Sequence, residues 1–118
     1  MVEKFKKLLQ EIIQSRGDVS IFAVAKMDDL TGKWTVILCA PWSENEKQRD
    51  AFGFIFQLLP KYFTDEEKNS IARISIFGKN EHLIELLLKY KNGSVIENEK
   101  VNGNLVHLAY ILASNSNI

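Results

Sequence analysis

Few residues of this chain combine a type and a spacing that could support catalysis or metal binding. Cys39, His82 and His107 are the only cysteine and histidines among the 118 residues, and they lie far apart in the sequence. A closed zinc site needs about four nitrogen or sulfur ligands, so this set predicts no zinc site. Cys39 lies in an apolar segment without the cationic neighbours that lower the pKa of a thiol. A buried structural thiol is therefore favoured over a nucleophile.

The carboxylate groups have simpler interpretations than acid–base or divalent-metal chemistry. Asp28 and Asp29 are adjacent in a short turn, and the sequence places no further carboxylate beside them. Glu97, Glu99 and Lys100 match the acidic-x-acidic-Lys run of metal-dependent nucleases, but the aspartate-bearing strand that should precede them is missing. Charged residues that protect an exposed edge strand explain this run better.

The sequence also lacks the motifs that are typical of nucleotide binding, acyl transfer and metalloproteases. The sequence has no glycine-rich phosphate loop, no Gly-x-Ser-x-Gly elbow and no pair of histidines at helical spacing. His107 is interpreted as a histidine satisfied on a sheet face rather than as a general base. We therefore assign no catalytic residue and expect neither a cofactor nor a bound metal.

The charge balance argues against nucleic acid as a partner. Lysine and arginine number 15, aspartate and glutamate also number 15, and the pI is near 6.7. A basic patch at Lys4, Lys6 and Lys7 is diluted by Glu3 and Glu11, which is typical of a solvated helix face. Binding to nucleic acid is therefore not expected.

The compartment is inferred from cysteine use and from hydropathy. A single cysteine cannot form an internal disulfide, and residues 1–5 lack the apolar stretch of a signal peptide. No apolar run approaches the roughly 20 residues that span a bilayer. We expect a cytoplasmic protein that is not embedded in a membrane.

The first half of the chain predicts a helix followed by two antiparallel strands. Apolar residues between Phe5 and Ile13 recur at helical spacing, and Gly17 is expected to end the helix after Arg16. Residues 19–25 and 34–40 are rich in β-branched and aromatic side chains and apolar on nearly both faces. The short polar segment between them favours a hairpin.

Two capping boxes predict the next helices. Ser43 with Glu46 is expected to open a helix that runs through Leu59 until Pro60 interrupts it. Thr64 with Glu67 predicts a second, short helix ending near residue 70. Residues 71–77 then form a third predicted strand.

The remaining elements complete an α+β domain. Asn80 is expected to cap a helix that ends at residues 92–93, and Asn102–Gly103 joins strands 95–101 and 105–113 as a hairpin. The polar segment 114–118 is expected to fray. The predicted order is α-β-β-α-α-β-α-β-β in one domain, residues 1–118, with a mixed, roughly five-stranded sheet. Strand 95–101 is expected at an edge and strand 105–113 inside.

A candidate ligand crevice follows from two strand-to-helix junctions. Residues 41–43 and 78–80 each present backbone N–H groups where a helix begins. If the preceding strands are parallel neighbours, both junctions open at the same end of the sheet, where ligand crevices form. Asp28 and Asp29 are expected at the opposite end from His82. The residues expected to line the crevice are Trp42, Ser43, Lys79, Asn80 and His82.

The width of two apolar helix faces predicts self-association. In the helices after residues 43 and 80, apolar side chains cover roughly 200° of the helix circumference, more than a sheet alone would cover. Phe54 and Leu86 lie at the rims of these faces and are the predicted interface residues. A homodimer is the commonest arrangement that buries such a surface.

Two hypotheses about function remain. The first is a non-catalytic interaction or regulatory module that self-associates, and it is favoured because no catalytic constellation is found. The alternative is a small-molecule-binding protein or small enzyme that uses the crevice around Trp42 and Lys79.

Overall fold

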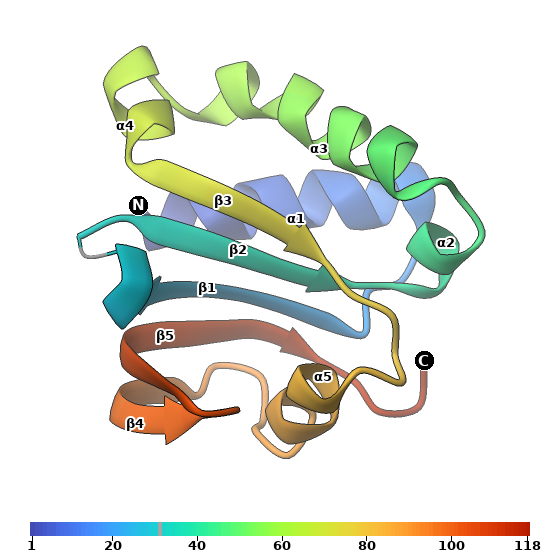
Figure 1. Ribbon diagram of the computed structural model, residues 1–118. Coiled ribbons are helices and arrows are strands. Elements are labelled where there is room, and N and C mark those ends of the chain that lie inside the picture. Colours follow the sequence, from blue (N-terminus) through green and yellow to red (C-terminus); the bar gives the residue numbers. More distant parts are fainter. Residues whose placement is uncertain (31) are drawn as a thin grey trace.

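The computed structural model describes residues 1–30 and 32–118, and its elements follow the predicted chain order. The elements are α1 (Val2–Arg16), β1 (Ile21–Met27), the 3-10 turn η1 (Asp28–Leu30), β2 (Trp34–Cys39), α2 (Pro41–Glu44), α3 (Gln48–Tyr62), α4 (Asp65–Asn69), β3 (Ile71–Ile76), α5 (His82–Leu87), β4 (Val95–Val101) and β5 (Asn104–Ser114). The strands in these ranges form one mixed sheet in the order β3-β2-β1-β5-β4 (Figure 1).

The sheet is antiparallel except at one edge. β1 pairs antiparallel with β2 and with β5, and β5 pairs antiparallel with β4. β2 and β3 are parallel, because the chain crosses over through α2, α3 and α4 between them. The predictions of a first hairpin, an interior last strand and a polar edge strand at 95–101 are confirmed.

Helices cover both faces of the sheet, which explains why the central strands are apolar on both sides. Figure 1 shows α1 behind the sheet and α5 in front of it, with α3 beside the β3 edge. On β1, Phe22 and Val24 pack toward α1 and α3, whereas Ile21 and Ala23 pack toward α5. Two separate hydrophobic cores result, and β1 and β2 contribute alternate residues to each.

The predicted helix from Ser43 to Leu59 is wrong in its details. Pro41 is the first residue of α2, and Ala40 is its N-cap, because the fixed φ of proline suits the first helical position. Ser43 therefore lies inside α2, where its Oγ donates to the carbonyl of Ala40 at 2.8 Å. A separate helix, α3, begins at Gln48 and continues through Pro60, which sits in the last turn, where few backbone hydrogen bonds remain to be lost.

Other local predictions agree with the structure in most cases. Thr64 and Glu67 form both hydrogen bonds of a capping box, and Gly17 ends α1 with a φ of 107°. Asn102 and Gly103 have φ values of 53° and 82°, as a two-residue hairpin turn requires. α5 is shorter than predicted, and its N-cap is Glu81 rather than Asn80.

The last residues, expected to fray, are held against the sheet. The Asn115 amide donates to the carbonyl of Ser20 at 2.8 Å, and the Ser20 hydroxyl donates to the carbonyl of Ile118 at 2.9 Å. Lys79 Nζ also donates to the Ile118 carbonyl, at 2.7 Å. Figure 1 shows the C-terminus beside the connection between β3 and α5.

Candidate functional site

The two strand-to-helix junctions lie at the same end of the sheet, because β2 and β3 are parallel neighbours. At the second junction, residues 78–80, two backbone donors are already occupied by carboxylates of the chain itself. Glu81 Oε2 accepts from the Gly78 amide at 2.6 Å, and Glu44 Oε1 accepts from the Lys79 amide at 2.9 Å. These two carboxylates leave the crevice little capacity for an anionic ligand.

The five predicted crevice residues have separate sets of contacts in the structure. Trp42 packs edge-on against Phe54, with ring centroids 6.0 Å apart, and lies near the guanidinium of Arg16. Ser43 is buried and bonded to its own helix, while Lys79 holds the C-terminal segment. Asn80 is exposed.

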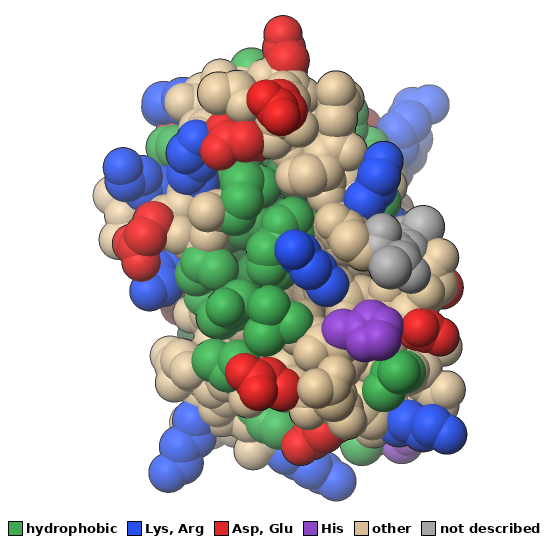
Figure 2. Space-filling model, turned by 90° about the vertical axis from the view of Figure 1, so that its left-hand side faces the viewer, with side chains coloured by type: hydrophobic (Ala, Val, Ile, Leu, Met, Phe, Trp, Pro, Cys, Tyr) green, Lys and Arg blue, Asp and Glu red, His purple; other side chains and the backbone are tan. Residues whose placement is uncertain are grey.

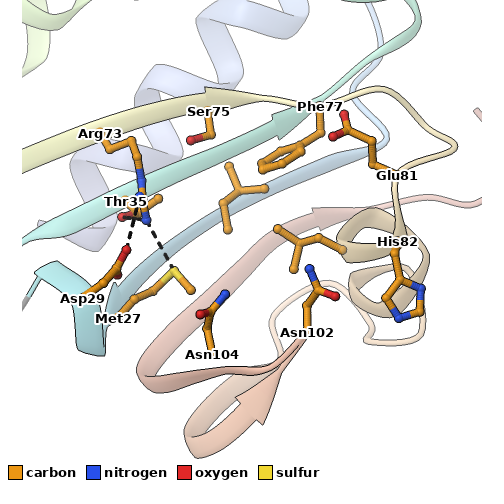
Figure 3. Close-up of a pocket in the computed structure, with 12 residues that line it drawn as sticks. Met27, Asp29, Thr35, Arg73, Ser75, Phe77, Glu81, His82, Asn102 and Asn104 are labelled. Carbon is orange, nitrogen blue, oxygen red and sulfur yellow. Dashed lines mark hydrogen bonds and ion pairs between the residues drawn. The ribbon is translucent and has the colours of Figure 1, made fainter.

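A cavity of about 320 Å³ lies on the face of the sheet that α5 covers (Figure 3). Its floor comes from β2 and β3, and its walls come from η1, the start of α5 and the turn between β4 and β5. The residues that line it are Met27, Asp29, Thr35, Ile37, Arg73, Ser75, Phe77, Glu81, His82, Leu83, Asn102 and Asn104. A mixture of apolar floor and convergent polar groups is typical of small-molecule sites.

His82 is the one predicted crevice residue that lines this cavity. Its ring is largely exposed, and Nδ1 lies 3.7 Å from the carboxylate of Glu85. Asp29 lines the same cavity, whereas the sequence predicted it at the far end of the sheet from His82. Asp29 does lie at the other end of the strands, but the cavity extends along β2 and β3 and reaches both (Figure 3).

Arg73 is the strongest hydrogen-bond donor in the cavity, and its contacts are long. Its guanidinium nitrogens lie 3.3 Å from Asp29 Oδ2, 3.4 Å from Thr35 Oγ1 and 3.9 Å from the Met27 sulfur. Arg73 Nε is buried and has no hydrogen-bond partner among the described residues. A charge-assisted pair is usually 2.7–2.9 Å long, so much of the donor capacity of Arg73 is unused.

Sequence reasoning missed Arg73 and Ser75, although a signal was present. Along β3, Ile74 and Ile76 pack toward the core shared with α1 and α3, whereas Arg73 and Ser75 point to the cavity. Such alternation of period two marks a strand with one polar face. For residues 71–77 the sequence predicts a strand, without a polar face.

An exposed apolar surface lies on α3. Phe52 and Phe56 are 38% and 56% exposed, and their rings stack with centroids 5.5 Å apart. Beside them is a mainly apolar hollow of about 280 Å³ that extends to the outer edge of β3. Its lining residues are Phe52, Phe56, Leu59, Lys68, Ile71, Ala72, Arg73 and Ile74.

The predicted interface residues occupy different positions from this surface. Phe54 is half-buried against Trp42, and the guanidinium of Arg16 lies 4.3 Å from the centre of its ring. Leu86 is half-buried among the side chains under α5. The part of the wide apolar face that stays uncovered is therefore formed by Phe52 and Phe56.

The end of the molecule where β2, β3 and β5 begin also shows hydrophobic side chains. Figure 2 shows them gathered in a band that is bordered by charged side chains. In this region His107 Nε2 lies 3.2 Å from Asp28 Oδ1, and both side chains are partly exposed. This pair agrees with the interpretation of His107 as a histidine satisfied on a sheet face.

Cys39 is buried and unpaired with another cysteine. Burial, and next the nearby Glu44 carboxylate, raise the pKa of its thiol to about 11. The thiol is therefore protonated near neutral pH, and it does not have the depressed pKa that a nucleophilic cysteine needs.

Within residues 1–30 and 32–118, no group of three or more histidine, cysteine, aspartate or glutamate side chains could hold a metal ion. None of the helices in the same ranges is long and apolar enough to cross a lipid bilayer. The fold and its surfaces thus define an α+β domain with one polar cavity and one exposed aromatic surface as candidate sites. No family model, curated protein or solved structure matches the chain.

Proposed function

We propose that this protein is a non-catalytic interaction module that forms a twofold homodimer through the exposed face of α3. The observation that carries the proposal is the stacked pair Phe52–Phe56, which leaves two large aromatic rings in solvent. Burial of apolar surface is the main favourable term in association, and exposed contiguous apolar surface usually marks an interface.

The shape of the α3 face supports a second copy of the chain as the occupant. Gly53 lies between the two aromatic residues in sequence, and a Cβ built there would meet no atom within 4 Å. A partner ring can therefore approach the helix backbone at Gly53. The apolar hollow beside Phe56 offers the complementary recess. A protruding ring next to a recess allows each subunit to insert Phe56 into its partner, as a twofold interface requires.

The edge of the sheet extends this surface. β3 has no strand partner on its outer side among the described residues, and Ala72, which is exposed, presents only a methyl group there. One outward carbonyl, that of Ile76, accepts from Gln48 Nε2 at 2.9 Å. At Ala72, beside the aromatic pair, the outer edge of β3 is therefore accessible to a partner. Near the end of β3 the carbonyl of Ile76 already has a hydrogen bond, which limits how far along the strand a partner can pair.

Sedimentation equilibrium of the full chain tests the proposal. We expect a dimer at concentrations of about 100 μM or below. Phe56→Glu should raise the dissociation constant of the dimer at least about tenfold, because a carboxylate in an apolar interface is strongly disfavoured. Ile13→Glu is the control, since Ile13 is a large hydrophobic residue that is 38% exposed but lies on α1. A monomeric mass up to about 100 μM, or equal weakening by both variants, would contradict the α3 interface.

We further infer a cytoplasmic setting. The support is that the single cysteine, Cys39, is buried with a raised pKa and needs no oxidising compartment for the fold to form.

A further inference from the structure

We propose that the cavity between Arg73 and Glu81 binds a small monocarboxylate with an apolar body and a hydrogen-bond donor at its far end. This site is separate in chemistry from the α3 face, because it combines charged groups at its ends with an apolar floor (Figure 3). Its volume, about 320 Å³, is at the lower end of the range of small-molecule pockets.

Arg73 supplies the anion-binding end. The three contacts of its guanidinium are between 3.3 and 3.9 Å long, and only one of them is to a charged group, Asp29. A carboxylate that meets the guanidinium fork with both oxygens forms shorter and stronger hydrogen bonds than this single contact. Asp29 is half-exposed, so its carboxylate can return to solvent at little cost when a ligand replaces it.

The floor of the cavity accepts the body of the ligand. Ile37 from β2, Phe77 after β3 and Leu83 from α5 line it with aliphatic and aromatic surface. Removing this surface from water contributes about 25 cal/mol for each Å² that is covered. An aromatic or branched aliphatic body is therefore preferred over a strongly hydrated one.

The far end of the cavity selects against a second negative charge. Glu81 lines that end, where its Oε2 accepts from the Gly78 amide and its Oε1 has no hydrogen-bond donor among residues 1–30 and 32–118. A hydroxyl or ammonium group of the ligand can donate to Glu81, whereas a second carboxylate would be repelled by it. Ser75, Asn102 and Asn104 add neutral donors and acceptors along the sides (Figure 3).

Three matched probes test the ligand class by two-dimensional ¹H–¹⁵N NMR titration of the full chain. The probes are 4-hydroxyphenylacetate, its uncharged amide 4-hydroxyphenylacetamide, and 4-carboxyphenylacetate, in which a second carboxylate replaces the hydroxyl. We expect the first to shift amide resonances of Ile37, Ser75 and Leu83 at millimolar concentration, and the other two to bind at least about tenfold more weakly.

Variants separate the two ends of the site. Arg73→Gln is expected to weaken binding of 4-hydroxyphenylacetate at least about tenfold, and Arg73→Lys to recover only part of it, because lysine lacks the guanidinium fork. Glu81→Gln should let 4-carboxyphenylacetate bind nearly as well as the monocarboxylate. Arg49→Gln is the control, since Arg49 is an exposed arginine on α3 that does not line the cavity.

The dispersion of the amide spectrum shows whether each variant remains folded. If no probe at 5 mM shifts resonances of cavity residues in the unmodified protein, the proposal is overturned. Equal binding of the acid and its amide, or a loss with Arg49→Gln as large as that with Arg73→Gln, would also overturn it.

Discussion

Glu67 joins α4 to α1 through its charge. Lys4 Nζ lies 2.5 and 2.6 Å from the two carboxylate oxygens, and the Thr64 amide donates to Oε1 at 2.9 Å. The ammonium of Lys4, and next the backbone amide of Thr64, lower the pKa of the Glu67 carboxyl from its ordinary value of 4.5 to about 2. The charged form of Glu67 is therefore favoured in the folded protein.

This pKa shift predicts how stability depends on pH. Because the pKa is depressed by folding, the stabilisation is fully present above about pH 4.5 and is lost as the pH falls toward 2. Glu67→Gln should lower the thermal midpoint at pH 7 but leave it little changed at pH 2. Thermal melts from pH 2 to pH 7 measure this, with Glu66→Gln as the control on the exposed side of α4. A constant difference at every pH would show that the charge of Glu67 is not responsible.

Single residues of the cavity were harder to predict than single residues of turns. Gly17, Asn102 and Gly103 act through their own backbone conformations, so their residue types alone indicated their roles. Arg73 acquires its role only from Asp29 and from its place on one face of β3, 44 positions away in sequence from that partner. The alternation along β3 indicated a polar face, but nothing near Arg73 in the sequence indicated Asp29 as its partner.

At the scale of elements, the two predicted capping boxes differ although their sequence patterns are alike. Thr64 accepts from the Glu67 amide at 3.1 Å as a true N-cap, whereas Ser43 donates back to Ala40 from inside α2. The difference arises from Pro41, which fixes the start of α2 two residues before Ser43. A cap predicted by pattern therefore depends on whether another residue starts the helix first.

Alanine substitutions at Thr64 and Ser43 test this difference between the two positions. Thr64→Ala should lower the free energy of unfolding by about 1 kcal/mol, the usual effect of losing an N-cap hydroxyl. Ser43→Ala should have a smaller effect, about 0.5 kcal/mol, because the Ala40 carbonyl still accepts from the Ser43 amide at 3.1 Å. Urea denaturation with unchanged m-values measures both. A larger effect at Ser43 would favour the capping role predicted from the sequence.

At the scale of the whole molecule, Lys79 ties distant parts of the chain together. Its Nζ contacts the carbonyls of Ser116 and Ile118, and the Ile118 carbonyl also accepts from Ser20, the residue before β1. Lys79 was predicted to line a ligand crevice. In the structure its ammonium forms hydrogen bonds that link the β3–α5 connection to the last residues.

Removing this ammonium should loosen the C-terminal segment without unfolding the sheet. We expect Lys79→Met, which keeps the aliphatic stem, to speed hydrogen exchange of the Asn115 amide about fivefold, since that amide bonds to Ser20 in the same cluster. Lys91→Met is a control at an exposed lysine outside the cluster. If exchange at Asn115 is the same in both variants, Lys79 does not hold this segment.

The class and order of the fold could be predicted because each element carries its own periodicity and turn residues. The strand order could not, because it depends on pairing between segments far apart, such as β1 with β5. The cavity depended on that order, since the β4–β5 turn with Asn102 must fold back beside β2 and β3 to form a wall. The two junctions of the predicted crevice lie at one end of the sheet, yet two amides of the second junction are bonded to Glu81 and Glu44.

The position of β1 has a consequence for how the chain folds while it is being synthesised. β1 is the central strand, and its pairing from Ile21 to Met27 on one side is with β5, residues 104–114. When only the first 100 residues have left the ribosome, β1 therefore has a long, apolar edge without a strand partner. Such an edge can pair with other nascent chains. Completion of the sheet must wait for the final strand, so this domain should depend on chaperone shielding during translation more than its small size suggests.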